Sequence, residues 1–418
     1  MIDKSEVEML FRDTENFMKS DKVRLAIIGC GGMAGAHLNA YIGLKKQGID
    51  IFDFVAMCDI DSDRASAFAA KTAEVQQDTQ PKVYTDIEEM LNRETLEAAD
   101  ICGPHFLHHT LAISCFEAGV DALVEKPLGV TVRAGRKMIE SAAAHNCILA
   151  IAEQVRRWVG PRTVEWIINK EKRIGQPRMF FRQGVGGGNS HPENRLRDER
   201  TTWRKNKLTS GGNGIIDGGV HYVDLLIYFF GEPDEIYARS ENMNQFQFRD
   251  ADGNHIPQTV EDTALATITF KNGVIGQWAN TGAAPGHGIS YNSYHGSLGS
   301  IYSGGGYPLS PELQLWDGTK QDKDTLQNAY MENLSNEEKQ RLFPHGITEG
   351  VMLEVYDFLD AVRTRCRPEL DGTDGLKAQA VCNAIYESGW SGQAVKFDDV
   401  YNERITGYQD EINERWQI

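Results

Sequence analysis

A glycine-rich turn between an apolar run and a helical pattern constrains this chain more than any other feature of its sequence. The run Leu25–Ile28 has the length and composition of a buried strand, and the letters GCGGMA follow it directly. In this G-x-G-x-x-A pattern, Gly29 permits a tight turn, Gly31 lets the backbone approach a pyrophosphate, and Ala34 leaves room for the helix to pack on the strand. Backbone N–H groups and the helix dipole would then hold the phosphate charge. The pattern predicts a dinucleotide site whose contacts include Gly29, Gly31, Gly32 and Met33.

The end of the next apolar segment supports the same prediction. The stretch FDFVAMCD ends at Asp59, whose carboxylate could accept hydrogen bonds from both hydroxyl groups of a ribose. Asp59 follows Gly29 by 30 residues rather than the usual ~20, so we expect an extended helix or loop between them. A carboxylate here would repel a 2′-phosphate, which favours NAD over NADP. Arg64 lies nearby and keeps the use of both cofactors open, and a plain strand-end turn remains the alternative for Asp59.

Strand-like and helical segments alternate through the first third of the chain. The later strand-like segments read KVYTD, AADICGP, DALVEKP and CILAIAEQ, and such alternation predicts a parallel, doubly wound α/β sheet. Ligands of these sheets bind beyond the carboxyl ends of the strands. Two alternatives stay open, since Lys126 could be a snorkelling strand end and His108 could cap the helix that it starts. The candidate cofactor contacts at these strand ends are Pro104, His105, His108, Glu125, Lys126 and Gln154.

The segment IIDGGVHYVDLLIYFFG, residues 215–231, has a helical period with one strongly apolar face. Asp217, His221, Asp224 and Tyr228 fall on its other face, so that the aspartate and the histidine are predicted one turn apart. This pairing suits proton transfer. Taken alone, it fits equally well a first-turn acid followed by a core histidine with a satisfied hydrogen bond.

The length, charge and cysteine pattern of the chain limit its expected number of domains, its partners and its compartment. At 418 residues the chain exceeds one ordinary core, which predicts two domains. Its net charge of −17 argues against nucleic acid and anionic membrane as partners. No apolar run approaches the ~20 residues of a membrane span, and the polar first 21 residues do not resemble a signal peptide. The seven cysteines lack C-x-x-C spacing, which favours free thiols in the cytoplasm and no metal site.

Nearly the whole chain, from about Val23 to Val395, resembles the Gfo/Idh/MocA oxidoreductases, the family of glucose–fructose oxidoreductase and inositol dehydrogenase. The resemblance is carried by IIGCGGMAGAHLNAY, by the EKP of residues 125–127, and by D-x-x-x-H from Asp217 to His221. It implies a Rossmann domain followed by an α+β domain with a large, mostly antiparallel open sheet. It also implies a nicotinamide cofactor, a carbohydrate-like substrate and a homodimer or homotetramer.

The resemblance also assigns the candidate chemistry. His221 is implied to remove the proton of a secondary hydroxyl group, because the ordinary pKa of a histidine, ~6.5, suits a base at neutral pH. Asp217 would orient the substrate hydroxyl or the imidazole, and Lys126 would stabilise the developing alkoxide charge. The substrate contacts expected are Arg157, Trp203, Arg204, Asp217 and His221.

The basic stretch at residues 184–212 is loop-like in sequence and includes Arg195 and Arg197. It is either a recognition loop for an anionic or extended sugar or a solvated loop, since it also carries acids. Four segments are expected along the chain. They are an N-terminal extension at 1–21, a Rossmann domain at 22–153, a substrate-binding and oligomerisation domain at 154–397, and a C-terminal tail at 398–418.

Three functions compete at this point. The first is an NAD-dependent dehydrogenase that oxidises a secondary hydroxyl of a sugar, glycoside or cyclic polyol to a ketone. The second is an enzyme that cleaves a glycoside through transient oxidation and elimination, which would need a further base. The third is a non-catalytic NAD-binding sensor, against which the joint presence of Lys126, Asp217 and His221 argues.

Overall fold

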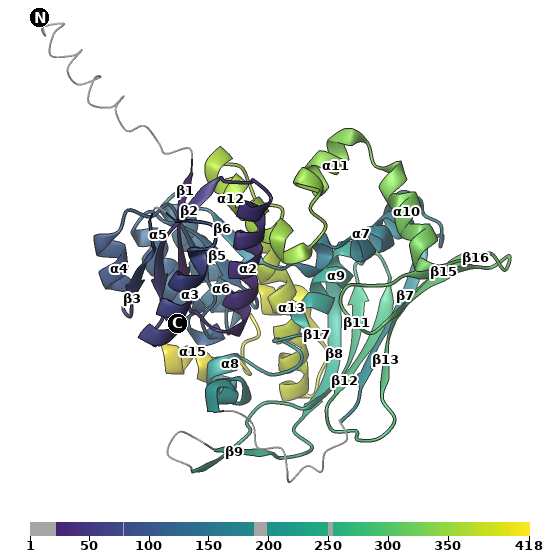
Figure 1. Ribbon diagram of the computed structural model, residues 1–418. Helices are drawn as coiled ribbons and strands as arrows, with labels where there is room; N and C mark the ends of the chain where they lie inside the picture. The colour runs from purple at the N-terminus through teal and green to yellow at the C-terminus, as the bar shows by residue number, and fades with distance from the viewer. Residues whose placement is uncertain (1–21, 78, 188–198, 250–253) are drawn as a thin grey trace, which may run out of the picture.

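Two β-sheets lie side by side in the computed structural model, with the long helices α12 and α13 between them (Figure 1). The structure describes residues 22–77, 79–187, 199–249 and 254–418. The expected N-terminal extension at 1–21 lies outside the described residues, and so do Arg195 and Arg197.

The first sheet is parallel, with the strand order β3-β2-β1-β4-β5-β6 of a dinucleotide-binding fold. This confirms the doubly wound sheet that the alternating pattern predicts. The order reverses beside β1, so the loop after β1 opens at the crevice where such folds bind ligands. The strands are β1 (Val23–Ile28), β2 (Phe52–Cys58), β3 (Lys82–Tyr84), β4 (Ala98–Ile101), β5 (Asp121–Glu125) and β6 (Leu149–Ala152). The helices between them are α2 (Gly32–Lys46), α3 (Ser62–Thr72), α4 (Ile87–Arg93), α5 (His108–Glu117) and α6 (Val132–Ala144).

Local sequence explains where these helices begin. Asp61 caps α3 by accepting the backbone N–H groups of Asp63 and Arg64 at 3.1 and 3.3 Å. Thr131 caps α6 by accepting the N–H of Ala134 at 3.2 Å. No side chain caps α2, which begins at the glycine loop. The N–H groups at the start of α2 therefore remain available to a ligand.

The second sheet has nine strands in the order β16-β15-β14-β13-β7-β12-β11-β8-β17. Only β7 and β12 pair in parallel, which confirms the mostly antiparallel sheet. A separate hairpin joins β9 (Gln247–Arg249) to β10 (His255–Pro257). The nine strands are β7 (Pro177–Val185), β8 (Pro233–Glu241), β11 (Thr263–Phe270), β12 (Ile275–Thr281), β13 (Ile289–Gly296), β14 (Gly299–Gly304), β15 (Glu312–Leu315), β16 (Lys320–Gln321) and β17 (Val395–Lys396).

The two faces of this second sheet differ, because apolar side chains alternate along its strands. The inner face packs against α9 (Val220–Phe230), where Phe180 stacks on Phe230 with ring centroids 5.9 Å apart. The outer face exposes about half of several large apolar side chains. These are Tyr237, Leu265, Ile275 and Tyr302.

The C-terminal part of the chain returns to the first sheet. Helix α12 (Gly350–Thr364) packs on α2, and α13 (Gly372–Ser391) packs on α6 and β6. The tail at 398–418 packs on the first domain of its own chain, where Thr131 donates to Asn413 at 2.7 Å. The remaining helices are α7 (Val159–Glu165), α8 (Lys207–Ser210), α10 (Lys323–Asn333), α11 (Asn336–Leu342), α14 (Phe397–Tyr401) and α15 (Asp410–Trp416).

The helix predicted over 215–231 is shorter than its periodicity indicates. It begins at Val220, and Asp217 lies in the turn before it. Gly219 ends that turn, and a Cβ at this position would lie 2.3 Å from the Trp278 ring. Close packing on the sheet therefore requires glycine here, and glycine interrupts the helical pattern. The stretch 184–212, predicted to be a loop, contains a 3₁₀ segment, η5 (Glu199–Lys205), and α8.

Candidate active site

The glycine loop forms the floor of a cleft beyond the carboxyl end of β1. Gly29 has a φ of +87°, and a Cβ there would lie 2.9 Å from the carbonyl of Cys102 on the neighbouring strand connection. A Cβ at Gly31 or Gly32 would meet no protein atom within 4 Å. Gly29 is therefore required by the fold, whereas Gly31 and Gly32 leave open space above the backbone, as a bound pyrophosphate requires.

Asp59 is held beside this loop by the backbone. Its carboxylate accepts the N–H of Cys30 at 2.7 Å and the N–H of Asp61 at 2.9 Å. Arg64, which is 44% exposed at its side chain, lies 3.7 Å from the same carboxylate. Asp59 is thus fixed at the edge of the cleft, with a cation next to it.

The cleft has a volume of about 540 Å³ and fits a dinucleotide by its chemistry, with an open glycine loop and a fixed carboxylate. Nine predicted contacts line it. They are Gly29, Gly31, Gly32, Met33, Asp59, Pro104, His105, Glu125 and Lys126. Trp203 and Arg204, predicted as substrate contacts, also line it. Trp203 packs edge-on against His105 at 4.8 Å, and the Arg204 guanidinium lies 4.6 Å from the Trp203 ring.

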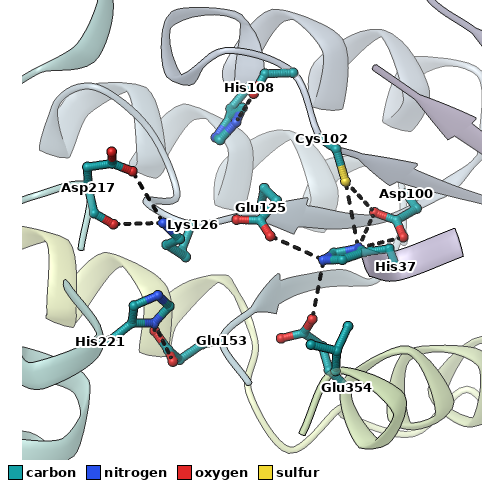
Figure 2. Close-up of polar contacts among 12 residues, drawn as sticks. His37, Asp100, Cys102, His108, Glu125, Lys126, Glu153, Asp217, His221 and Glu354 are labelled. Carbon is teal, nitrogen blue, oxygen red and sulfur yellow. Dashed lines mark hydrogen bonds and ion pairs between the residues drawn. The ribbon is translucent and has the colours of Figure 1, made fainter. Parts of the chain in front are cut away.

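Lys126 meets Asp217 from the opposite half of the molecule, as Figure 2 shows. Its Nζ donates to the Asp217 carbonyl at 2.7 Å and to Oδ1 at 3.3 Å. Arg204 forms an ion pair with the other carboxylate oxygen, and His105 Nε2 lies 3.6 Å from Oδ1. Burial alone would raise the pKa of Asp217, but the hydrogen bond from His105 and the charges of Lys126 and Arg204 hold that pKa far below its usual range.

His221 is oriented by Glu153 rather than by Asp217. Its Nδ1 lies 2.7 and 2.8 Å from the two carboxylate oxygens of Glu153, which follows β6. Burial favours the neutral acid, yet the charge and hydrogen bond of His221 outweigh it and lower the pKa of Glu153. The charge of Lys126 also lowers the pKa of this carboxyl group. The interpretation of Asp217 as the group that orients the imidazole is thus not supported by these contacts, which assign that position to Glu153.

Beneath the cleft lies a buried polar network. The Nδ1 of His37 lies 2.9 Å from Asp100, and its Nε2 lies 3.1 Å from Glu125 and 3.6 Å from Glu354 (Figure 2). Burial would lower the pKa of His37, but the charge of Asp100 raises it well above its ordinary value. His37 thereby fixes Glu125, the residue next to Lys126. Within the described residues, one set of His, Cys and acidic side chains is close enough to share a metal ion, and it is His37, Asp100 and Cys102.

The turn that carries Asp217 is held by Glu261, which sequence reasoning missed. The carboxylate of Glu261 accepts the N–H of Asn213 at 3.0 Å, the N–H of Ile215 at 3.1 Å and the hydroxyl of Tyr386 at 2.9 Å. Burial raises the pKa of Glu261 to about 7, although these hydrogen bonds oppose the rise. The one sequence signal was an acid placed two residues before the apolar strand pattern of β11.

Asp217 and His221 are not among the residues that line the cleft, and three further predicted contacts do not line it either. His108 is fully buried, with its ring nitrogens 2.9 Å from the carbonyls of Pro127 and Gly103, and burial followed by the charge of His105 lowers its pKa to about 4. It supports the cleft from behind. The prediction of Arg157 as a substrate contact is not supported by the structure. Its guanidinium is buried in ion pairs at 3.0 Å with Asp357 and 2.9 Å with Glu369. The third is Gln154, whose buried Oε1 has no hydrogen-bond partner.

Comparison with protein families gives matches over most of the chain. A family described as "Oxidoreductase family, NAD-binding Rossmann fold" matches residues 23–153. A second, described as "Oxidoreductase family, C-terminal alpha/beta domain" of the Gfo/Idh/MocA group, matches residues 170–397. In the described part of the chain, no helix is both long and apolar enough to cross a membrane.

Individual proteins of this kind are similar over nearly the same span. D-apiose dehydrogenase of Paraburkholderia graminis is 24% identical over 378 residues, which are 89% of this chain and 88% of that protein. D-glucoside 3-dehydrogenase of Escherichia coli is 28% identical over 279 residues, 64% of this chain and 72% of that protein. The structure of a levoglucosan dehydrogenase with NADH and L-sorbose matches with a TM-score of 0.74 at 19% identity, over 90% of this chain and 99% of that one. At this identity the structural match shows the fold alone.

Proposed function

Because the chain belongs to the Gfo/Idh/MocA oxidoreductase family, we propose that it oxidises a secondary hydroxyl group of a sugar, glycoside or cyclic polyol to a ketone with NAD. The observation that carries the proposal is the pairing of Lys126 with Asp217 and of His221 with Glu153, contacts that join the two halves of the chain next to the glycine-lined cleft. Relatives named as dehydrogenases of D-apiose and of D-glucosides support a carbohydrate-like substrate.

The proposed chemistry follows from the hydrogen bonds of the site. Glu153 accepts from Nδ1 of His221, which leaves Nε2 with a lone pair that can take the hydroxyl proton. Lys126 stabilises the negative charge that develops on the same substrate oxygen. Asp217 fixes the Lys126 amine by accepting its hydrogen bonds. A bound NAD would supply the hydride acceptor, and the released proton stays on His221, next to the Glu153 carboxylate.

We assign the cofactor to the loop of Gly29, Gly31 and Gly32 and to Asp59. The uncapped start of α2 would face the pyrophosphate, and Asp59 would accept from the ribose hydroxyls. The carboxylate favours NAD, since a 2′-phosphate would place like charges side by side. NADH in the structures of relatives supports the same assignment.

We also propose that the protein forms a homodimer or homotetramer in the cytoplasm. The exposed apolar side chains on the outer face of the second sheet, among them Leu265 and Tyr302, favour burial against a second copy. All seven cysteines lie within the described residues and are unpaired, which suits a reducing compartment. Light scattering of the wild type and of Leu265→Glu tests the first point, and an unchanged mass for the variant counts against this face.

One experiment separates the three competing functions. The protein is incubated with NAD and a panel of polyols, free sugars and aryl glycosides, while the absorbance of reduced nicotinamide and the release of aglycone are followed together. Net NADH without aglycone supports the dehydrogenase. Aglycone without net NADH supports cleavage through transient oxidation. Bound NAD with neither signal across the panel overturns both enzymes and leaves the sensor.

A further inference from the structure

Arg182 is a buried cation for which the described residues offer no anionic partner. It lies near the carboxyl end of β7 on the inner face of the second sheet, and only 7% of its surface is exposed. In the register of the sheet, Arg182 lies opposite Trp278 of β12 and Asn292 of β13, and neither of these residues is charged. No ion pair among the described residues includes Arg182, whereas the other two arginines that are less than a tenth exposed, Arg157 and Arg162, both contact Glu369.

The hydrogen bonds of Arg182 leave most of its donors unused. Its Nη1 donates to the carbonyl of Gln183 at 2.8 Å and approaches that of Tyr291 at 3.4 Å. Its Nε is buried without any hydrogen-bond partner, and no hydrogen bond joins Nη2 to a described residue. The guanidinium lies 3.7 Å from the centre of the Tyr222 ring, whose π-electrons are its main compensation.

This arrangement is costly unless an anion completes it. Arginine stays protonated even when buried, so it cannot lower the cost by losing its charge. Buried charges are ordinarily paired, and a planar guanidinium with free N–H groups matches a carboxylate or a phosphate group. The free donors of Arg182 therefore suit an anion that arrives from outside the chain.

The surroundings of Arg182 connect it to the catalytic side chains. The Tyr222 ring lies 4.6 Å from the Tyr307 ring, which in turn lies 5.1 Å from His221. The Tyr307 hydroxyl donates to the carbonyl of Gly218, next to Asp217, at 2.7 Å. The charges of Glu153 and Arg182 both act on this phenol, whose pKa is raised mainly by burial. Arg182 thus lies two aromatic rings away from the proposed base.

The neighbour of Arg182 along the inner face of β7 has no side chain. This next inward-facing residue is Gly184, and a Cβ there would lie 3.5 Å from Nη2 of Arg182 and 3.2 Å from Oδ1 of Asn280. Glycine therefore places no side chain of its own between the guanidinium and this neutral hydrogen-bonding amide.

We propose that Arg182 binds a carboxylate or phosphate group of the substrate, so that the preferred substrates are acidic sugars. The inference rests on the proposed function, since it takes His221 and Lys126 to mark the reacting end of the same substrate. The anion lies at the far end from the oxidised carbon, and Asn280 is placed to accept from a neighbouring hydroxyl of the sugar.

The test compares neutral sugars with their acidic derivatives. Binding to the NADH-loaded protein is measured by calorimetry for glucose and galactose, for their uronic acids, and for their 6-phosphates. The variants are Arg182→Met, which keeps the length of the side chain without its charge, and Arg182→Lys, which keeps the charge without the planar fork. Arg178→Met, at an exposed arginine of the same strand, is the matched control.

Wild type is expected to bind at least one acid or phosphate more tightly than its neutral counterpart. Arg182→Met should weaken that binding by ~100-fold, in line with losing one partner of a buried charge pair, and should leave neutral sugars within about threefold. Arg182→Lys should recover part of the loss, and Arg178→Met should behave as wild type. Uronic acids and 6-phosphates then distinguish a carboxylate from a phosphate.

Other outcomes overturn the proposal. Equal weakening of neutral and acidic sugars, together with a lower unfolding temperature, would show that Arg182 only supports the sheet. Failure of every anionic sugar to bind would exclude the site as well. Binding is read without turnover, so anion binding that depends on Arg182 but gives no NADH would contradict the proposed function while leaving this inference intact.

Discussion

The two sides of the cleft are built in different ways. On the nucleotide side, the backbone shapes the site, because Gly31 and Gly32 leave the loop open and the N–H of Cys30 fixes Asp59. On the reacting side, side chains from distant segments converge, as Lys126 on Asp217 and His221 on Glu153. The first arrangement joins groups at most 29 residues apart in sequence. The second depends on four polar side chains that meet across 91 and 68 residues of chain.

The largest effect is expected on the reacting side, from His221→Ala. Loss of the base should reduce turnover by about 10²- to 10⁴-fold at saturating NAD, while the affinity for NAD changes little. Steady-state kinetics and a separate NAD titration measure the two quantities. His255→Ala, at an exposed histidine of the β9–β10 hairpin, is the control and should keep full activity. A loss of NAD affinity in His221→Ala would mean that this residue belongs to the nucleotide side of the cleft.

The second prediction concerns the pH dependence of stability on the reacting side. The pKa of Glu261 is raised to about 7 in the folded protein. The contribution of this carboxyl group to the free energy of unfolding is therefore fully present below its unfolded pKa of ~4.3 and is lost as the pH rises through 7. Glu261→Gln removes this dependence. From pH 4.5 to pH 8, the free energy of unfolding of wild type should fall relative to the variant by about 3 kcal/mol. Urea denaturation across this range is the measurement, and parallel curves would mean that Glu261 remains ionised.

On the nucleotide side, two glycines should respond differently to alanine. Gly31→Ala adds a methyl group that meets no protein atom, so the unliganded protein should keep its stability while NAD binds ~10- to 100-fold more weakly. Gly29→Ala places a Cβ against the Cys102 carbonyl at positive φ and should destabilise the fold by about 1–3 kcal/mol. Denaturation without nucleotide and NAD titration separate these effects. Equal stability losses in both variants would refute the distinction.

The smallest effect is expected from Asp59→Asn, which keeps an acceptor for a backbone N–H and removes the charge. The ratio of kcat/KM for NAD over NADP should fall by roughly tenfold, because repulsion of the 2′-phosphate is lost while Arg64 remains. Parallel assays with both cofactors give the ratio. An unchanged ratio would mean that Asp59 serves only to hold the loop.

The same contrast explains what the sequence could predict. The parallel sheet and the glycine loop follow from patterns within short segments, whereas the second sheet was expected from the family resemblance. The family resemblance paired Lys126 with the Asp217 region. Glu153 and Glu261 were not assigned their roles, because a single acid between apolar segments has no pattern of its own. Arg157 was misplaced because its partners lie 200 residues and more along the chain.

The return of the C-terminal helices to the first sheet has a consequence for protein engineering. Gln379 of α13 accepts the N–H of Gly129, and Leu370 accepts that of Ile151, so the nucleotide-binding half is completed by residues near the end of the chain. A fragment cut after residue 153 would expose the apolar surfaces of α2 and α6 that α12 and α13 cover. Chimeras that transfer cofactor preference between relatives must therefore exchange two separated stretches of sequence. Exchange of the N-terminal stretch alone would leave the surfaces of α2 and α6 without the α12 and α13 that match them.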